Sequence, residues 1–352
     1  MSKQWRCAVV GTGVVGGTHV RVIPQLPQAK LVAICDVKPE NSLTALKKAE
    51  ISDVPIYTSQ REMLRKEQID VVHIATPSGV HMEPALEAIE AGVNIICEKP
   101  LEITLERADR IIEAAAKKNV RVGCIFQNRW KPENRAIRKA AEENRFGKVT
   151  WAGSFTPWYR TDKYYEDGGW RGTWKFDGGG AVMNQSIHSI DLLQWIAGPV
   201  RRVSAYAASR IHAKIEVEDT LTCALQFESG AFGTILGTTA LFPGQPPRIE
   251  IGGENGTAIA ENGLKVFTFR DETPEDKQLL EQLSPNSAAS PTKSNPGAIN
   301  NQAHGGNIAG ILQAWEEGRE AETNAVEARK SLAIVLAMYE SARRDGEPVD
   351  VK

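Results

Sequence analysis

The sequence predicts an α/β protein whose first domain is a parallel sheet covered by helices and whose second domain is α+β. Three observations lead to this fold class. Apolar runs alternate with helical stretches over the first 126 residues, a glycine-rich motif directly follows the first run, and longer strand candidates follow one another after residue 132. At roughly 150 residues per domain, a chain of 352 residues has about two domains. We expect domains at residues 1–126 and 127–352.

The first domain contains five apolar runs that are the predicted strands: residues 6–10, 31–35, 71–75, 94–97 and 121–126. The runs are continuous rather than alternating in polarity, which is typical of parallel strands covered on both faces. Helix starts lie between them. Ser59 and Glu62 form a capping-box pattern, and Thr104 precedes a long helical stretch that ends at Asn119. The predicted topology is therefore a repeated βαβ unit.

The second domain has a different pattern. We predict a helix from residue 132 to about 145, a strand at 149–155, a loop rich in glycine and aromatic residues, and a helix at about 181–197. Further strands are expected at residues 203–209, 221–227, 231–239, 248–252, 257–260 and 264–269. Residues 284–301 read as a low-complexity loop, and a last helix is predicted at about 324–344. This terminal helix can pack back on the first domain.

Composition excludes several classes of protein. Hydrophobic residues make up 41% and charged residues 24%, as in ordinary globular proteins. The net charge of -2 gives no electrostatic footprint for nucleic acid or for an anionic membrane. No apolar run reaches the ~20 residues that a membrane span needs, so we expect a cytoplasmic protein. The cysteines are scattered without a C-x-x-C pair, which favours small buried thiols, and we predict no metal site.

The glycine-rich motif predicts a dinucleotide site. It follows the first strand, opens a helix, and consists of Gly11, Thr12, Gly13, Val14, Val15 and Gly16. Gly11 allows a tight turn, Gly13 lets the backbone approach a pyrophosphate, and Gly16 lets helix and strand pack closely.

A carboxylate at the end of the next strand strengthens this prediction. Asp36 lies 20 residues after Gly16, where it can accept hydrogen bonds from both hydroxyls of an adenosine ribose. It would also repel a 2′-phosphate, so the sequence favours NAD as the cofactor. Lys38 nearby keeps NADP as the less favoured alternative.

Three further motifs resemble one family. They are Ala75-Thr76-Pro77-Ser78-Gly79-Val80-His81 after the fourth strand, Glu98-Lys99-Pro100 after the fifth, and Gly178-Gly179-Gly180-Ala181-Val182-Met183-Asn184-Gln185-Ser186-Ile187-His188-Ser189-Ile190-Asp191. Together they resemble the family of glucose-fructose oxidoreductase, inositol dehydrogenase and MocA (Gfo/Idh/MocA). The resemblance implies a Rossmann domain, a C-terminal domain on a large, open, mostly antiparallel sheet, and pyridine-nucleotide chemistry on a hydroxyl-bearing carbon, usually of a sugar or cyclitol.

Lys99 and His188 are the candidate catalytic residues. Lys99 ends a parallel strand, where ligands of such sheets bind, and a partly desolvated ammonium beside a cationic nicotinamide can exchange a proton with a substrate hydroxyl. The resemblance makes His188 an acid/base as well, with Asp usual four residues earlier. This chain has Asn184 there, so the sequence leaves open whether Lys99 or His188 is the base. Asp191 can orient His188 or act as a solvated or capping residue.

The resemblance also implies contacts to the cofactor after the fourth and fifth strands. His81 is expected at the nicotinamide half, the alternative being a histidine on the helix surface, and Thr76 and Pro77 are expected among the cofactor-binding residues. Glu98 is expected at the nicotinamide ribose or paired with Lys99. Pro100 is expected to fix the turn through a cis bond.

The loop at residues 157–177 is the candidate substrate loop, because aromatic rings stack on sugars and arginine binds hydroxyls or carboxylates. Its expected substrate contacts are Tyr159, Arg160, Trp170 and Arg171, joined by Asn184 and more loosely by His304. The alternative is that the aromatic residues anchor the loop or form a subunit contact.

Three functions remain at this point. The leading one is an NAD-dependent dehydrogenase of a sugar, sugar derivative or cyclitol. The others are an NAD-dependent glycosidase that oxidises the sugar transiently, and a non-enzymatic nucleotide sensor, which would lack a proton-transfer residue. Phe232 and Leu236 lie on one face of a predicted strand and Ile235 on the other, so neither face is clearly solvated. With the family resemblance, this predicts a homodimer or homotetramer.

Overall fold

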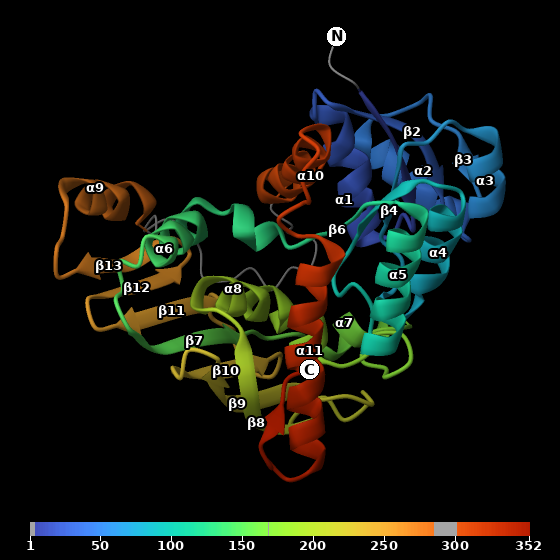
Figure 1. The fold of residues 1–352 in the computed structure, drawn as a ribbon. Helices are drawn as coiled ribbons and strands as arrows, with labels where there is room; N and C mark the ends of the chain where they lie inside the picture. Colours follow the sequence, from blue (N-terminus) through green and yellow to red (C-terminus); the bar gives the residue numbers. More distant parts are fainter. Residues whose placement is uncertain (1–3, 168, 285–300) are drawn as a thin grey trace. The chain divides into compact units, whose positions relative to one another are not determined.

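The computed structural model describes residues 4–167, 169–284 and 301–352 (Figure 1). The chain forms two compact units. The first comprises Met1–Gln127 and Pro296–Arg329, and the second comprises Asn128–Asn295 and Lys330–Lys352. The first unit thus includes a C-terminal stretch of the chain that the predicted boundary at residue 126 did not assign to it.

A parallel six-stranded sheet forms the centre of the first unit, in the order β3-β2-β1-β4-β5-β6. Its strands are β1 (Trp5–Val10), β2 (Ala29–Cys35), β3 (Ile56–Tyr57), β4 (Val71–Ile74), β5 (Asn94–Cys97) and β6 (Val122–Cys124). All five predicted strands are present, and β3 is a two-residue strand outside the predicted runs. Because the strands are parallel, the loops after β1, β4 and β5 lie at the same edge of the sheet.

The helices of this unit are α1 (Val14–Val22), α2 (Pro39–Ala49), α3 (Gln60–Lys66), α4 (Met82–Glu90), α5 (Leu105–Lys118) and α10 (Asn301–Glu316). The predicted caps are confirmed, because Ser59 accepts a hydrogen bond from the Glu62 amide and Thr104 accepts one from the Arg107 amide. Asn119 ends α5 with a left-handed backbone at φ 53°.

Helix α10 completes the core of the first unit. It packs beside α1 (Figure 1), and Ile308, Ile311 and Leu312 are fully buried among the apolar side chains of β1, β2 and α1. Trp315 contacts Trp5 edge to face at 5.9 Å between ring centroids. A segment some 300 residues from the first strand therefore closes one side of the parallel sheet.

The second unit contains an eight-stranded sheet in the order β13-β12-β11-β7-β10-β9-β8-β14. The strands are β7 (Val149–Pro157), β8 (Val200–Ala208), β9 (Thr220–Phe227), β10 (Phe232–Thr238), β11 (Arg248–Gly253), β12 (Gly256–Glu261), β13 (Leu264–Phe269) and β14 (Val349–Asp350). All pairs are antiparallel except β7 with β10, which is parallel. The mostly antiparallel sheet is as predicted, with β14 added from the end of the chain.

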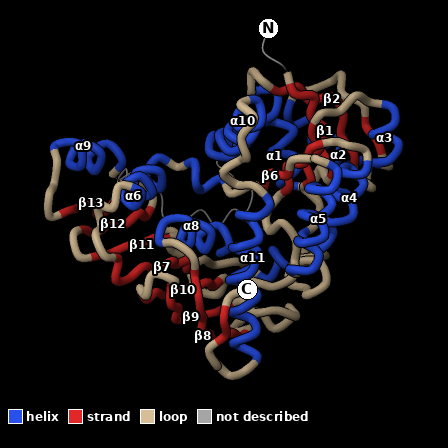
Figure 2. The backbone as a smooth tube through the Cα atoms, in the orientation of Figure 1, coloured by secondary structure: helices blue, strands red, loops and turns tan. Residues whose placement is uncertain are grey.

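Helices α6 (Pro132–Glu142) and α8 (Ile187–Ala197) lie over one face of this sheet (Figure 2). The unit also contains α7 (Asp162–Glu166) and α9 (Pro274–Leu283). Helix α11 (Ala325–Arg343) runs from the first unit into the second. The predicted low-complexity loop lies almost wholly outside the described residues, and none of the described helices is long and apolar enough to cross a membrane.

Candidate active site

The glycine-rich turn has the geometry that a dinucleotide requires. Gly11 has φ +83°, and a Cβ on it would lie 2.7 Å from the backbone of Ala75. A Cβ on Gly16 would lie 1.8 Å from the Gly11 carbonyl oxygen, so both positions exclude a side chain. A Cβ on Gly13 would meet nothing within 4 Å, and no side chain caps the N-terminus of α1 there. The open turn and the uncapped amides fit a pyrophosphate.

Val14 and Val15 form the first turn of α1, and Val14 is exposed. Their amides are among the N-terminal groups that lack a partner within a helix. The motif thus places backbone donors, rather than side chains, at the expected phosphate position.

Asp36 follows β2 and is held by four donors. One carboxylate oxygen accepts the Thr12 amide at 2.7 Å and the Thr12 hydroxyl at 3.0 Å. The other accepts the Lys38 amide at 2.9 Å and the Asn41 side chain at 3.2 Å. A carboxylate has about four acceptor positions, so ribose hydroxyls would replace the two side-chain donors, from Thr12 and Asn41. Ser42 Oγ, 3.1 Å from Thr12 Oγ1, offers that hydroxyl another partner.

His81 joins the loops after β4 and β5. Its Nδ1 lies 2.9 Å from the Pro100 carbonyl oxygen, and its Nε2 lies 3.0 Å from the Thr76 carbonyl oxygen. The ring is buried, which fixes the Thr76–Pro77 turn against the turn that carries Lys99. The Lys99–Pro100 peptide is cis, as predicted. The described contacts of the His81 side chain are therefore with the two loops themselves.

Glu102 anchors the segment that follows Lys99. Its buried carboxylate accepts the Met82 amide at 3.1 Å and the Ile103 amide at 2.6 Å, and it pairs with Arg107 at 2.8 Å. Lys99 is thus held between β5 and a well-bonded turn at the carboxyl edge of the sheet.

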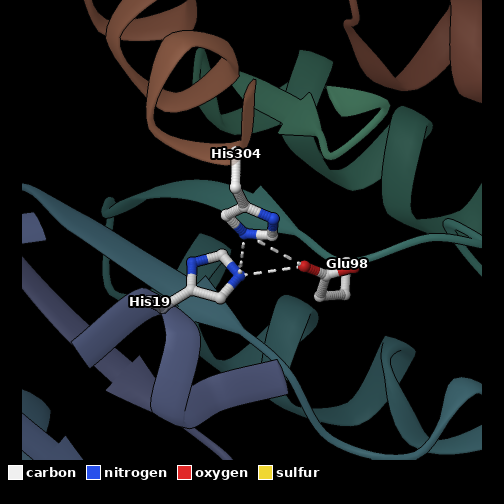
Figure 3. Close-up of side chains that lie close together, drawn as sticks. All are labelled: His19, Glu98 and His304. Atoms are coloured by element: carbon white, nitrogen blue, oxygen red, sulfur yellow. Dashed lines mark hydrogen bonds and ion pairs between the residues drawn. The ribbon is translucent and has the colours of Figure 1, made fainter. Parts of the chain in front are cut away.

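Glu98 points into a buried cluster with His19 and His304 (Figure 3). Its Oε1 lies 3.0 Å from His19 Nε2 and 3.4 Å from His304 Nε2, and its other oxygen accepts the Lys99 amide. His73 Nδ1 lies 3.0 Å from His19 Nδ1 and extends the cluster. Burial raises the pKa of Glu98, but the His19 hydrogen bond and the nearby charges of His304, His19 and Lys99 outweigh it and lower that pKa to about 2.

The same cluster offers three ligand atoms within 4.8 Å of one another, from His19, Glu98 and His304, a set that can hold a metal ion. Hydrogen bonding among the three side chains accounts for the same arrangement, and the pKa of His304 is lowered to about 4, mainly by burial. The sequence analysis did not identify His19 and His73 as site residues. Only their positions in the sequence could have indicated them, because His19 lies one helical turn after Gly16 and His73 lies inside the apolar run of β4.

In the second unit, a chain of hydrogen bonds connects the predicted substrate residues. Asn184 Nδ2 donates to Asp177 at 2.5 Å, and Gln185 Nε2 donates to Asn184 at 2.8 Å. Gln185 also donates to the Tyr164 hydroxyl at 2.7 Å and accepts from Arg160 Nη2 at 3.0 Å. Asn184 therefore donates a hydrogen bond to the buried carboxylate of Asp177. The sequence showed only that Asn stands at position 184 where the family usually has Asp.

Asn184 lies in a π-helical turn, Ala181–Ser186, and His188 lies in the first turn of α8. The sequence predicted one continuous α-helix here. Such wider turns are frequent at functional sites. The turn begins at Gly180, where a Cβ would lie 1.7 Å from the Glu218 carbonyl oxygen, so the preceding glycines allow a close backbone approach.

Buried Glu218 holds the start of this turn. Its carboxylate accepts the Gly180 amide at 3.0 Å, the Val182 amide at 2.9 Å and the Tyr339 hydroxyl at 3.0 Å. Burial raises the pKa of Glu218 to about 7 in spite of these bonds. Neither Glu218 nor Tyr339 was a predicted site residue, because both act through contacts distant in sequence.

Asp191 has a different role from the two that the sequence suggested. It is buried, pairs with both the Nε and the Nη2 of Arg129 at 2.7 Å, and accepts a hydrogen bond from Ser331 at 3.0 Å. It therefore anchors α8 instead of orienting His188 or facing solvent. The three-residue spacing of His188 and Asp191 in the sequence did not indicate that Asp191 pairs with the buried Arg129.

The aromatic loop is ordered by stacking. Arg171 lies 4.6 Å from the ring centroid of Tyr164 and 5.3 Å from that of Trp170. Tyr159 pairs with Ala240 as a β-bridge and contacts the Phe242 ring at 5.2 Å. Several of these aromatic residues thus anchor the loop, as the alternative interpretation held, while Trp170 and Arg171 stay half-buried.

The structure distributes the predicted residues between the units. The first unit holds the glycine-rich turn, Asp36, Thr76, Pro77, His81, Glu98, Lys99 and His304. The second holds Asn184, His188, Tyr159, Arg160, Trp170 and Arg171. His304 lies in the first unit, where it is only 1% exposed and bonded to His19. Its predicted substrate contact stays a prediction.

The fold and the glycine-rich turn define an NAD-binding oxidoreductase. Residues 5–126 match the oxidoreductase family with the NAD-binding Rossmann fold, and residues 134–259 match the GFO/IDH/MocA C-terminal domain. The chain belongs to the Gfo/Idh/MocA family of oxidoreductases. This confirms the predicted family, the Rossmann fold, the class of enzyme and NAD as the cofactor.

Three relatives show the range of the family. The WlbA dehydrogenase from Bordetella pertussis, solved in complex with NADH and UDP-GlcNAcA, is 32% identical with a TM-score of 0.89, and the match covers 100% of this chain and 99% of that one. D-apiose dehydrogenase from Paraburkholderia graminis is 28% identical, with 99% of this chain and 90% of that protein covered. Myo-inositol 2-dehydrogenase from Thermotoga maritima is 27% identical, with 73% and 75% covered.

Proposed function

We propose that this protein is an NAD-dependent dehydrogenase that moves a hydride between nicotinamide and a hydroxyl-bearing carbon of a sugar, a sugar derivative or a cyclitol. One observation carries the proposal. The open glycine-rich turn after β1 and Lys99 after β5 lie at the same edge of one parallel sheet, with Asp36 beside the turn. A dinucleotide site and a proton-transfer group thus belong to one rigid sheet edge.

The residues divide the work as follows. Bound NAD would supply the hydride acceptor. The amides at the start of α1 bind phosphate, and Asp36 accepts ribose hydroxyls. Lys99 or His188 takes the proton that leaves the substrate hydroxyl, because loss of a hydride from carbon requires loss of that proton from oxygen. Asn184 donates to, or accepts from, the other hydroxyls of the substrate.

NADH formation tests this function directly. The substrates to be offered with NAD are UDP-GlcNAcA, D-apiose, myo-inositol, free hexoses and aryl glycosides, with absorbance at 340 nm as the readout. Net NADH formation from at least one of the non-glycosidic compounds is expected. Release of the aglycone without net NADH would instead support the NAD-dependent glycosidase, and NAD binding without turnover of any compound would contradict an enzyme.

Lys99→Ala should lower kcat by roughly 10²- to 10⁴-fold while NAD affinity stays unchanged, because the side chain is assigned to proton transfer. Lys117→Ala, at an exposed lysine of α5, is the matched control. Turnover at the wild-type rate in Lys99→Ala would exclude this role, and calorimetry with NAD would show that the nucleotide site is intact.

A further inference from the structure

Arg160 is a buried cation that forms no ion pair with any carboxylate of the described residues. Its side chain follows β7 and the residue is only 8% exposed. Its hydrogen bonds go to neutral oxygens, from Nη1 to the Tyr159 carbonyl at 3.2 Å and from Nη2 to Gln185 Oε1 at 3.0 Å. Its buried Nε has no partner among the described residues, and none of their carboxylates forms an ion pair with it. Buried charges are normally paired, so this arrangement calls for an explanation.

Aromatic stacking offsets only part of the cost of burying this charge. The guanidinium lies 4.8 Å from the ring centroid of Trp158 and 5.4 Å from that of Tyr164. Such contacts stabilise a cation less than a carboxylate does. Burial lowers the pKa of Arg160, and nearby Arg171 lowers it further. The surroundings therefore leave a positive charge that a negative group would stabilise.

Arg171 adds a second unpaired cation beside the same ring. It stacks on Tyr164, and its Nη1 donates a hydrogen bond to the Tyr164 carbonyl oxygen at 3.5 Å. Asp177, an acid of this hydrogen-bond network, accepts the Gly172 amide and the Asn184 side chain. Two guanidinium groups thus flank one tyrosine in the loop that holds the predicted substrate residues.

The position of Arg160 links this charge to the candidate substrate site. Through Gln185 it is two hydrogen bonds from Asn184, the residue expected to touch substrate hydroxyls. A group bound to the free face of Arg160 would therefore lie close to a substrate held by Asn184. The buried Nε of Arg160 is the donor that such a group could satisfy.

We propose that Arg160, assisted by Arg171, forms an oxyanion subsite, and that the substrate carries a carboxylate or phosphate group in addition to the hydroxyl that is oxidised. The proposal rests on the dehydrogenase function proposed above and narrows its substrate class. A guanidinium fork matches both carboxylate and phosphate oxygens, so the shared chemistry is a bound oxyanion.

Matched pairs of compounds separate the two sources of the anion. UDP-GlcNAcA and UDP-GlcNAc differ only in the carboxylate, as do glucuronate and glucose. Glucose 6-phosphate and glucose differ in a phosphate. Each pair is measured for kcat/KM with NAD and, independently of turnover, for binding to the NADH-loaded protein by calorimetry. The variants are Arg160→Gln, Arg160→Lys and the control Lys163→Gln, which removes an exposed charge from the same loop.

The wild type and Lys163→Gln should prefer the acidic member of at least one pair by about 10- to 100-fold, the scale of a charge-assisted hydrogen bond. Arg160→Gln should abolish that preference, and Arg160→Lys should keep part of it, while NAD affinity is unaffected. A preference within the carboxylate pairs would indicate a carboxylate subsite, and a preference within the phosphate pair would indicate a phosphate subsite. Because the readout is a ratio within one variant, partial loss of folded protein does not alter it.

Equal binding by wild type of the two members of every pair, or a preference that survives in Arg160→Gln, would overturn the subsite. So would failure of every acidic compound to bind. Selective binding of the acidic member that depends on Arg160 but yields no NADH would keep the subsite and reject the dehydrogenase function. The two proposals therefore fail by different results.

Discussion

Single residues determine cofactor choice in the first unit. Asp36 is nearly buried and accepts bonds from Thr12, Lys38 and Asn41, so it both shapes the glycine-rich turn and supplies the negative charge beside it. A fixed carboxylate of this kind accepts ribose hydroxyls and repels a 2′-phosphate. We therefore expect the preference for NAD over NADP to depend on the charge of Asp36.

Asp36→Asn should weaken NAD binding by ~1 to 3 kcal/mol, the scale of a hydrogen bond to a charged group, and should narrow the difference between NAD and NADP. Asp53→Asn, at an exposed acid of the same unit, is the control. Calorimetric titration with both nucleotides measures the effect. NAD affinity that is unchanged in both Asp36→Asn and Asp36→Ala would refute the assignment.

The identity of the base is also decided at the residue scale. An ordinary imidazole has a pKa of about 6.5, so a histidine base gives an oxidation rate that rises with pH through a limb near neutrality. His188→Asn should then abolish the limb. If the Asp177 carboxylate, which is bonded to Asn184, stabilises the His188 imidazolium, Asp177→Asn should move the limb to lower pH.

The same pH profiles support Lys99 as the base if His188 is not the base. A limb of kcat against pH that survives His188→Asn unshifted would exclude the histidine base and leave His188 as a donor that orients the substrate. The profile of the wild type, recorded under the same conditions, is the reference for both variants.

At the scale of elements, the π-helical turn before α8 depends on Glu218 and Tyr339. Glu218 comes from the segment before β9 and Tyr339 from α11, and both bond to the amides of Gly180 to Met183. An acid at the N-terminus of a helical segment satisfies its unpaired amides. The position of Asn184 therefore depends on two residues far from it in sequence.

Glu218→Gln should change the pH dependence of stability. The folded pKa is about 7, above the usual 4.5, so folded wild type binds a proton more tightly than the unfolded chain does. The unfolding free energy of wild type should therefore fall by ~3 kcal/mol as pH rises from about 4.5 to about 7, and then level off. Glu218→Gln should lack this fall.

Denaturant titrations at pH 5 and pH 8 measure the difference between wild type and variant. Glu228→Gln, at an exposed acid of a hairpin turn, should behave like wild type. A parallel pH dependence in wild type and Glu218→Gln would show that Glu218 is ionised throughout this range, as its three donors alone would favour.

At the scale of the whole molecule, the second sheet has one face that its helices leave uncovered. Ile235 is fully buried, whereas Phe232 on the opposite face of β10 is 64% exposed and Tyr206 of β8 is 59% exposed. Trp151 and Phe155 of β7 pair with Phe232 and Leu236 and extend the same face. An apolar sheet face of this kind favours self-association.

We therefore expect a homodimer or homotetramer that buries this face. Phe232→Lys should shift it toward monomer, because a charge at the centre of an apolar interface is costly to bury. Val37→Lys, at an exposed valine of the first unit, is the control. Sedimentation velocity at micromolar concentration measures the species present, and a wild type that is only monomeric would contradict the prediction.

Structural features that depend on residues close together in the sequence could be predicted from the sequence. The glycine-rich turn, the caps Ser59 and Thr104, and the continuous apolar runs each depend on neighbouring residues, so the sequence predicts them without the rest of the fold. The same holds for Asp36, because a strand end and its preceding glycine motif fix its place. The family motifs then indicated Lys99 and His188.

Contacts between distant segments required the tertiary structure. The return of α10 to the first unit brings His304 to His19 and Glu98, and no local pattern encodes a contact over 285 residues. The tertiary structure also determines that Asp191 pairs with Arg129 and that Glu218 holds the turn of Asn184. Among the described residues, it leaves the buried Nε of Arg160 without a partner. A side chain's charge is visible in the sequence, but its partners and its exposure to water depend on which segments fold against it.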